Sequence, residues 1–207
     1  MRLISKLTRR FLKPAETLDG YDHPELIDLV FRKAQIYSPT TSWPEISGAK
    51  TVLDFGGGCG QHFKEANSSL VRWAVVETPA MAERAKELST DRLQFFTDIR
   101  SAADWLGDID VMHSNGAIQY TPKPEEALSK LCALRAKKML WYRVFLGEPD
   151  IEVQVSCLGD NGPGYLPIRE KLVRYERARI AESSFHDAHI GYRLAERGED
   201  WFHYSLI

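Results

Sequence analysis

The chain has little cysteine, and its three cysteines do not form a recognisable set. Cys59, Cys132 and Cys157 lie far apart in 207 residues and include no C-x-x-C pair. This pattern argues against a disulfide framework and against a zinc ribbon. No run approaches the roughly 20 apolar residues of a membrane-spanning helix, and the first residues lack the apolar core of a secretory signal. We therefore predict a cytoplasmic location.

A strong charge of one sign is absent as well. The 27 Lys and Arg residues are nearly balanced by 29 Asp and Glu residues, which gives a formal net charge of -2. The long-range attraction that dominates nucleic-acid binding is therefore missing, and we expect no nucleic-acid partner. With 43% hydrophobic residues, a chain of this length can bury one sizeable core and is short for two. We predict a single globular domain.

The amino-terminal 13 residues depart locally from this charge balance. Their basic side chains lie opposite four apolar positions at helical spacing, and Pro14 ends the stretch. The apolar positions are Leu3, Ile4, Leu7 and Phe11. Two interpretations stay open: peripheral contact of residues 1–13 with an anionic membrane, or packing on the domain with the basic groups in water.

Apolar segments alternate with helical ones from Lys50 onward, which is typical of βαβ units. We predict an α/β fold with a mostly parallel sheet, helices on both faces and a carboxyl-terminal hairpin of residues 192–196 and 201–207. The predicted helices span 61–69, 79–88, 102–106, 124–134 and 168–183, with residues 153–155 in an excursion before the last of them. A helix within 21–37 and a Ser, Thr and Pro-rich loop over 38–47 form a lid. The expected division is 1–48 for the basic helix and lid, and 49–207 for the main domain.

Glycine is concentrated in one place, after the apolar run that begins at Val52. The sequence there is Val52-Leu53-Asp54-Phe55-Gly56-Gly57-Gly58-Cys59-Gly60. A glycine-rich turn at the carboxyl end of a buried strand lets the backbone approach a ligand that a Cβ would repel, and its amides can meet a carboxylate. Asp54 must find donors within the apolar strand, either loop amides or a ligand's ammonium. The segment predicts a nucleotide-type cofactor site.

The following strand, residues 71–77, ends in Glu77, where a ribose would be held. The dinucleotide pattern G-x-G-x-x-G is broken because Gln61 stands at the third glycine position, and no lysine follows Gly60 as a P-loop requires. What remains is Asp-x-Gly-x-Gly-x-Gly over residues 54–60. It resembles motif I of the class I S-adenosylmethionine-dependent methyltransferases, and the resemblance implies a Rossmann-like fold with a seven-stranded sheet and Glu77 on the ribose hydroxyls.

The resemblance continues in order along the chain. Residues 93–98 look like the third strand of that family, whose terminal acid, here Asp98 with Ile99 after it, lies beside the adenine. Residues 108–120 are similar to the motif IV region, which implies that Ser114 and Asn115 line the site near the transferred methyl.

Four short phrases extend the likeness beyond the cofactor motifs: Phe-Gly-Gly-Gly, Val-Val-Glu-x-Pro-Ala-Met, Gln-Tyr-x-Pro-x-Pro and Val-Gln-Val. Together they resemble a group of bacterial methyltransferases associated with surface-polysaccharide genes. The likeness covers roughly residues 17–207 and is strongest over 50–125.

Methyl transfer is a displacement in which alignment of the two reactants does most of the work. If the acceptor must lose a proton, we predict His113, Gln119 and Tyr120 as the catalytic candidates, and only His113 has a suitable unperturbed pKa. A histidine within an apolar strand is more often a packed core residue, so that interpretation stays open for His113. Arg143 is a candidate for gripping an anionic acceptor, with a structural role as its alternative.

The sequence offers one weak candidate for a metal site. His186 and His189 stand three residues apart without an evident third ligand, so we predict no metal site. The expected function is S-adenosylmethionine-dependent methylation of a small-molecule acceptor, with a sugar or glycan precursor suggested only by the family association. Two alternatives stay open: a non-catalytic binding or assembly module with the same fold, and an NAD(P)-dependent oxidoreductase. The oligomeric state is not predicted.

Overall fold

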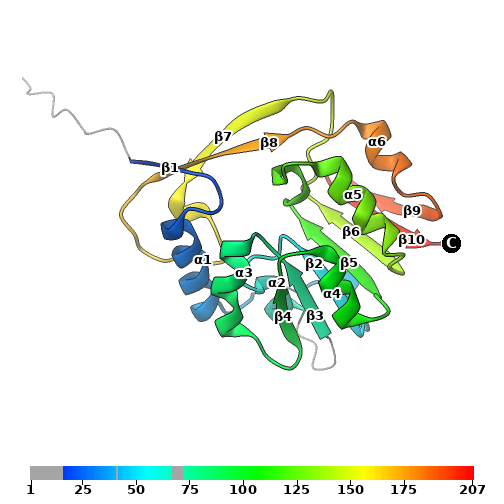
Figure 1. Cartoon of the computed structure of the whole chain (residues 1–207), viewed down its shortest axis with the longest axis horizontal. Coiled ribbons are helices and arrows are strands. Elements are labelled where there is room, and N and C mark those ends of the chain that lie inside the picture. Colours follow the sequence, from blue (N-terminus) through cyan, green and yellow to red (C-terminus); the bar gives the residue numbers. More distant parts are fainter. Residues whose placement is uncertain (1–15, 41, 67–71) are drawn as a thin grey trace, which may run out of the picture.

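The computed structural model describes residues 16–40, 42–66 and 72–207. Its larger sheet has seven strands in the order β4-β3-β2-β5-β6-β10-β9 (Figure 1). These strands are β2 (Thr51–Phe55), β3 (Arg72–Val76), β4 (Leu93–Phe96), β5 (Val111–Asn115), β6 (Lys138–Tyr142), β9 (Tyr192–Arg197) and β10 (Phe202–Leu206). The first five pair in parallel, and β10 is antiparallel to both β6 and β9. The predicted sheet and carboxyl-terminal hairpin are confirmed.

The large sheet is buried on both faces because neighbouring residues of a strand pack into two different cores. Val52 belongs to a core that also holds residues of α1 (Pro24–Ile36) and α3 (Pro79–Ala85). Leu53 belongs to the opposite core, with residues of α4 (Ile99–Leu106), α5 (Pro124–Ala133) and α6 (Glu182–Asp187). Helices therefore cover both faces, as predicted. Central parallel strands of this kind read as continuous apolar runs, which explains why the sequence identified them.

Most predicted helices are present with small shifts at their ends. Helix α2 (Gln61–Glu65) follows the glycine loop, and its predicted extension to residue 69 reaches beyond the described residues. A 3-10 turn over Lys86–Leu88 continues α3, and α4 begins three residues earlier than predicted. None of the described helices is long and apolar enough to cross a membrane. The predicted membrane contact of residues 1–13 lies outside the described residues.

The helix predicted over 168–183 is wrong. Residues Leu172–Ala178 form strand β8, at the centre of a second sheet with the order β1-β8-β7, in which β1 is Thr17–Asp19 and β7 is Ile151–Cys157. Within β8, Val173 and Tyr175 are buried while the intervening Arg174 is exposed, which is the period-two pattern of a strand. Residues 153–155, predicted as an excursion, lie within β7.

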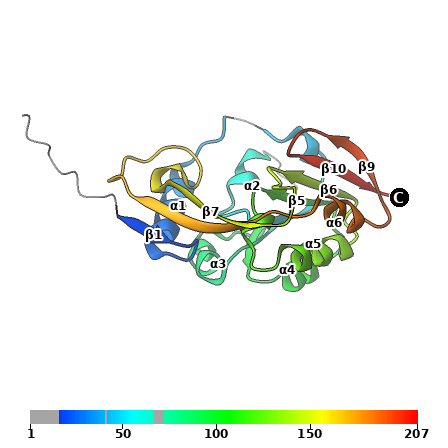
Figure 2. The same cartoon turned by 90° about the horizontal axis from the view of Figure 1, so that it is seen from above.

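The long strands of this small sheet run from the neighbourhood of α1 to that of α6 (Figures 1 and 2). One buried lysine connects the lid helix to the segment that follows β7 through hydrogen bonds. The Lys33 ammonium, on α1, donates to the carbonyl oxygens of Gly159, Asn161 and Gly162 at 2.9, 2.7 and 3.3 Å. The lid helix shares a core with the large sheet. The division at residue 48 stays a prediction.

Candidate functional site

The glycine loop adopts a backbone that other residues rarely take. Gly56, Gly58 and Gly60 have φ angles of 73°, 58° and 80°. A Cβ on Gly56 would lie 2.1 Å from the Cβ of Ala117, so the close approach of two loops requires glycine there. A Cβ on Gly58 would make ordinary contacts with Gln61 and Val30, at 3.7 and 3.8 Å, and Gly58 lines a cavity.

This cavity has a volume of about 330 Å³, and we call it the glycine-loop cavity. It lies at the carboxyl ends of β2, β3, β5 and β6 and is bounded on the other side by Tyr21 and by residues of β7 and β8. Open α/β sheets bind ligands at this edge. Its lining consists of Tyr21, Val30, Gly56, Gly58, Gln61, Glu77, Thr78, Met81, Asn115, Gly116, Tyr120, Arg143, Gln154, Ser156, Asp160, Asn161, Gly162 and Tyr175.

Glu77 lies where the sequence predicted it, at the end of β3 beside the glycine loop. Its Oε1 accepts a hydrogen bond from the Gly58 amide at 2.8 Å, and its Oε2 accepts one from the Thr78 amide at 3.0 Å. Burial raises the pKa of Glu77, while these two amides act in the opposite direction. Each carboxylate oxygen keeps further acceptor capacity toward the cavity.

Asp54 lies in the core below this loop, fully buried, and its donors differ from those we predicted. Its carboxylate accepts hydrogen bonds from Nδ1 of His113 at 2.8 Å, Nδ1 of His62 at 2.9 Å and Nε1 of Trp73 at 3.1 Å. Burial alone would raise the pKa of Asp54, but the two imidazoles outweigh it and the pKa lies below its usual range. The pKa of His62 is raised because the attraction of Asp54 exceeds the effect of burial, whereas burial lowers that of His113. We therefore assign the compensating proton to His62.

Asp54, His62 and His113 are a possible set of metal ligands, because their ligand atoms lie within 4.8 Å of one another. A metal bound by the Nδ1 atom of His113 would place that ring's proton on Nε2, which has no partner among the described residues. The hydrogen-bonded arrangement avoids this buried orphan donor. The sequence did not reveal this cluster. The absence of a metal site stays a prediction.

The other histidine pair is used in packing. Nε2 of His189 accepts from Nε1 of Trp141 at 2.9 Å, and its ring stacks on Tyr204 with centroids 3.7 Å apart. His186 is hydrogen-bonded through Nδ1 to the Tyr204 hydroxyl. Neither arrangement assembles the third ligand that a metal site would need.

Only one of the three predicted catalytic residues lines the cavity. Tyr120 does so, and its hydroxyl donates to Oε1 of Gln154 at 2.6 Å. Gln119 is buried, and its Nε2 donates to the Arg143 carbonyl at 3.0 Å. His113 is fully buried and does not line the cavity, because it pairs in register with Asp54, two residues before β5 ends. His113 is therefore a packed core residue, which was the alternative interpretation of this histidine.

The residues assigned by resemblance to the adenine and methyl sides are separated. Asn115 lines the glycine-loop cavity, while the neighbouring Ser114 is buried on the strand before it. Asp98 is exposed, caps α4 by accepting from the Ser101 amide at 2.8 Å, and lines a different hollow together with Ile99. That hydrogen bond lowers the pKa of Asp98. The adenine assignment of Asp98 and Ile99 stays a prediction.

The small sheet, whose strand pairing the sequence did not predict, supplies a polar wall of the cavity. Tyr175 of β8 donates to Oδ1 of Asn161 at 2.9 Å and is hydrogen-bonded to the Ser156 hydroxyl. Tyr21 stacks on Tyr175 with ring centroids 4.5 Å apart and meets Tyr120 edge-on at 5.3 Å. The signal that could have found this wall is the alternation of Gln154 and Ser156 with valines, which is typical of a strand with one polar face.

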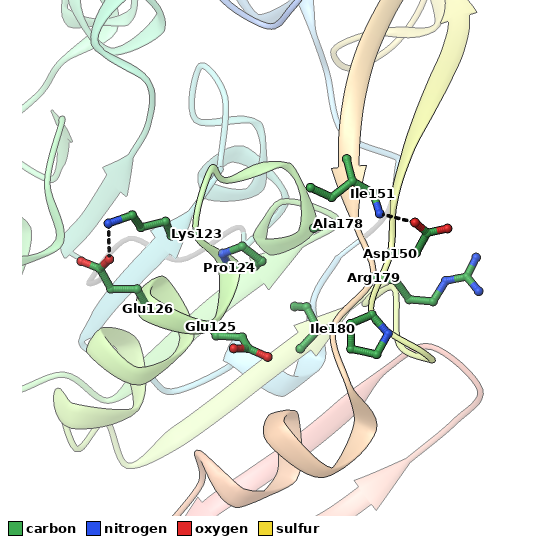
Figure 3. A pocket seen from close by; sticks show the side chains of 10 residues that line it. Lys123, Pro124, Glu125, Glu126, Asp150, Ile151, Ala178, Arg179 and Ile180 are labelled. Carbon is green, nitrogen blue, oxygen red and sulfur yellow. Dashed lines mark hydrogen bonds and ion pairs between the residues drawn. The ribbon is translucent and has the colours of Figure 1, made fainter.

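Another hollow lies between the start of α5, the start of β7 and the end of β8 (Figure 3). Its lining shares no residue with the glycine-loop cavity. The charged Lys123 pairs with Glu126 at 3.3 Å, and Asp150 accepts from the Ile151 amide at 2.8 Å (Figure 3). Among the described residues, the lining of this hollow contains no glycine-rich turn at the carboxyl end of a parallel strand. The glycine-loop cavity is the better candidate site.

Solved structures of methyltransferases share this fold. DesVI from Streptomyces venezuelae superposes with a TM-score of 0.53 at 12% sequence identity, covering 88% of this chain and 92% of that one. The glycopeptide N-methyltransferase MtfA complexed with sinefungin gives 0.50 at 10% identity, covering 86% and 87%. No protein-family model matches the chain, and no curated protein matches it in sequence. The similarity therefore lies in the fold: a seven-stranded, mostly parallel sheet with a carboxyl-terminal antiparallel hairpin, as in class I methyltransferase structures.

Proposed function

We propose that this protein is an S-adenosylmethionine-dependent methyltransferase acting on a small-molecule acceptor. The observation that carries the proposal is the pairing of Glu77 with the Gly58 amide at 2.8 Å, at the cavity above the carboxyl ends of the parallel strands. A half-buried carboxylate acceptor beside bare main chain suits a ribose next to an amino-acid carboxylate. The fold shared with methyltransferase structures supports the same cofactor.

The residues around the cavity fit this cofactor. Glu77 would accept hydrogen bonds from the two ribose hydroxyls, and the amides of the glycine loop would meet the methionyl carboxylate. Gly58 lines the cavity, so a large side chain there would reduce the room for the cofactor. When bound, S-adenosylmethionine supplies an electrophilic methyl group on a sulfonium.

The contribution of the protein's own residues to methyl transfer is then to align the acceptor with the methyl donor. Tyr120 and Asn115 line the cavity at the end of β5 and its following loop, where an acceptor would approach. Burial raises the pKa of Tyr120, so its hydroxyl keeps its proton and acts as a hydrogen-bond donor, not as a base. Holding the acceptor close to the donor methyl supplies most of the rate enhancement such a displacement needs.

Hydroxyl and amide groups of Gln154, Ser156 and Asn161 form one wall of the cavity. Such groups exchange hydrogen bonds with hydroxylated ligands, and the Tyr21 and Tyr175 rings offer flat apolar surface. These features support a sugar or glycan precursor as the acceptor, in agreement with the family resemblance. A cytoplasmic location and the lack of a nucleic-acid partner belong to the same proposal.

The non-catalytic alternative is favoured by one observation: no histidine lines the cavity among the described residues. The oxidoreductase alternative is disfavoured by Gln61, which stands in the cavity wall where a dinucleotide site requires glycine.

Titration calorimetry with S-adenosylhomocysteine and, separately, NAD⁺ and NADP⁺ tests the proposal. We expect micromolar binding of S-adenosylhomocysteine alone, and release of a labelled methyl group in the presence of a sugar acceptor. Preferential binding of a nicotinamide dinucleotide would contradict the proposal, and cofactor binding without turnover on any acceptor would favour the non-catalytic module.

A further inference from the structure

Arg143 has an unusual backbone and a fixed side chain. Its φ angle is 52°, in the left-handed region where non-glycine residues are uncommon. Its Nε donates to Oδ1 of Asn115 at 2.6 Å, and its Nη2 donates to the Asn115 carbonyl at 3.1 Å. The guanidinium lies against Gly116, where a Cβ would approach its Cζ to 3.0 Å. These contacts hold the cation across the end of β5.

The other described non-glycine residue with a positive φ has a simpler explanation. Arg135, with a φ angle of 57°, follows the last turn of α5, and its Nη1 donates to the Ile190 carbonyl at 2.9 Å. Left-handed residues are common after helices. Arg143 instead follows strand β6, so helix termination does not account for its conformation.

Arg143 is also the only cationic side chain in the glycine-loop cavity as the described residues define it. It has no carboxylate partner among those residues, whereas Arg177 of β8 and Arg179, which follows β8, both pair with Glu152. A guanidinium carries five N–H donors, of which Asn115 takes two. The remaining donors form a planar fork of the kind that binds carboxylate and phosphate groups.

The order of the strands places this cation away from the proposed ribose site. Glu77 follows β3, the glycine loop follows β2, Asn115 ends β5 and Arg143 follows β6, in the spatial order β3-β2-β5-β6. Three strand spacings, about 14 Å, therefore separate the ends carrying Glu77 and Arg143. With the methionyl carboxylate assigned to the glycine loop, Arg143 stands on the side left for the acceptor.

We propose that Arg143 binds an anionic group on the acceptor, a carboxylate or a phosphate, and thereby orients a hydroxylated acceptor such as an acidic sugar or a sugar phosphate. The inference rests on the proposed function, because the acceptor side is defined by where the cofactor binds. Asn115 positions the guanidinium, and the Tyr120–Gln154 pair bonded at 2.6 Å lines the same cavity.

The test uses titration calorimetry on the full chain in two steps. The first measures the affinity for S-adenosylhomocysteine, and the second adds glucuronate, glucose 1-phosphate or glucose to the loaded protein. The carboxylate and phosphate arms separate the two sources of negative charge, and glucose is the neutral reference. The variants are Arg143→Gln and the charge-retaining Arg143→Lys, with Arg174→Gln as matched control because Arg174 pairs with Asp19 outside the cavity.

We expect the loaded protein to bind at least one anionic sugar about tenfold more tightly than glucose. Arg143→Gln should remove this preference while leaving S-adenosylhomocysteine affinity within about twofold. Arg143→Lys should keep part of the preference, and Arg174→Gln all of it. The inference is overturned if glucose binds as well as both anionic sugars, if Arg143→Gln keeps the preference, or if that variant loses cofactor affinity. Failure of the unmodified protein to bind S-adenosylhomocysteine in the first step would instead reject the proposed function, and this inference with it.

Discussion

Nδ1 of His113 donates a hydrogen bond to Oδ1 of Asp54 at 2.8 Å, and both side chains are fully buried. His62 donates to the other carboxylate oxygen at 2.9 Å. The two imidazoles share one carboxylate but titrate in opposite directions: the pKa of His62 is raised by Asp54, and that of His113 is lowered by burial. A charged Asp54–His62 pair beside a neutral His113 therefore stabilises the end of β2, the strand that leads into the glycine loop.

The opposite shifts predict opposite pH dependences for two matched variants. The raised pKa of His62 gives stability that is fully present below its unfolded pKa, about 6.5, and is lost as pH rises through the folded pKa. The lowered pKa of His113 gives stability that is present above about pH 6.5 and is lost as pH falls through the folded pKa. The destabilisation caused by His62→Gln should therefore shrink with rising pH, and that caused by His113→Gln should grow.

Urea unfolding of the unmodified protein and both variants between about pH 5 and pH 8 measures these differences. Each variant serves as the control for the other, because both replace an imidazole bonded to the same carboxylate. Parallel curves, or curves that change in the reverse order, would refute the proton assignment.

Glu77 should matter for the cofactor through its charge. Glu77→Gln keeps the size of the side chain but replaces a carboxylate that accepts from the Gly58 and Thr78 amides and would accept from the ribose. Hydrogen bonds to a charged group contribute about 1.5–3 kcal/mol, so S-adenosylhomocysteine affinity should fall by about tenfold to a hundredfold. Glu87→Gln, on the exposed turn after α3, is the control and should bind normally. An unchanged dissociation constant for Glu77→Gln in calorimetry would remove Glu77 from the site.

The buried Lys33 ammonium should hold the lid helix against the small sheet. Lys33→Met would leave the carbonyls of Gly159, Asn161 and Gly162 without this donor, and we expect a loss of about 2–4 kcal/mol in the free energy of unfolding. Hydrogen exchange should accelerate over residues 159–162 first. Lys86→Met, at an exposed lysine in the 3-10 turn after α3, should change neither measurement. Equal protection of residues 159–162 in both variants would show that the lysine does not fix this loop.

The central strands and the glycine loop could be predicted because their signals are local. Val52 and Leu53 face different cores, so both must be apolar, and Glu77 is located simply by following the next strand. Strand β8 could not be predicted in the same way. Its charged residues Arg174, Glu176 and Arg177 mimic an exposed helix face, and its pairing partners are remote in sequence, at β1 and β7.

The arrangement of the candidate site was hard to predict for a similar reason. His113 stands two residues before the end of β5, and only the register with Asp54 shows that it points into the core below the cavity. Tyr175 and Gln154 line the cavity because the small sheet lies at the carboxyl-end edge of the large sheet, and no local sequence pattern reveals this packing. Asp98 had two local interpretations: the structure shows the helix cap, and the adenine assignment stays a prediction.

The most direct test of the central claim compares Gly58→Arg with Gly107→Arg in calorimetric titrations with S-adenosylhomocysteine. Both glycines have positive φ angles, 58° and 73°, but Gly58 lines the cavity while Gly107 ends α4 with nothing within 4 Å of its added Cβ. Gly107→Arg also carries backbone strain, because its ψ of −124° lies outside the left-handed region, so it controls for strain, and only Gly58→Arg fills the cavity. We predict that Gly58→Arg loses at least about a hundredfold in affinity and that Gly107→Arg binds like the unmodified protein. Full affinity in Gly58→Arg would contradict the assignment of this cavity to the cofactor.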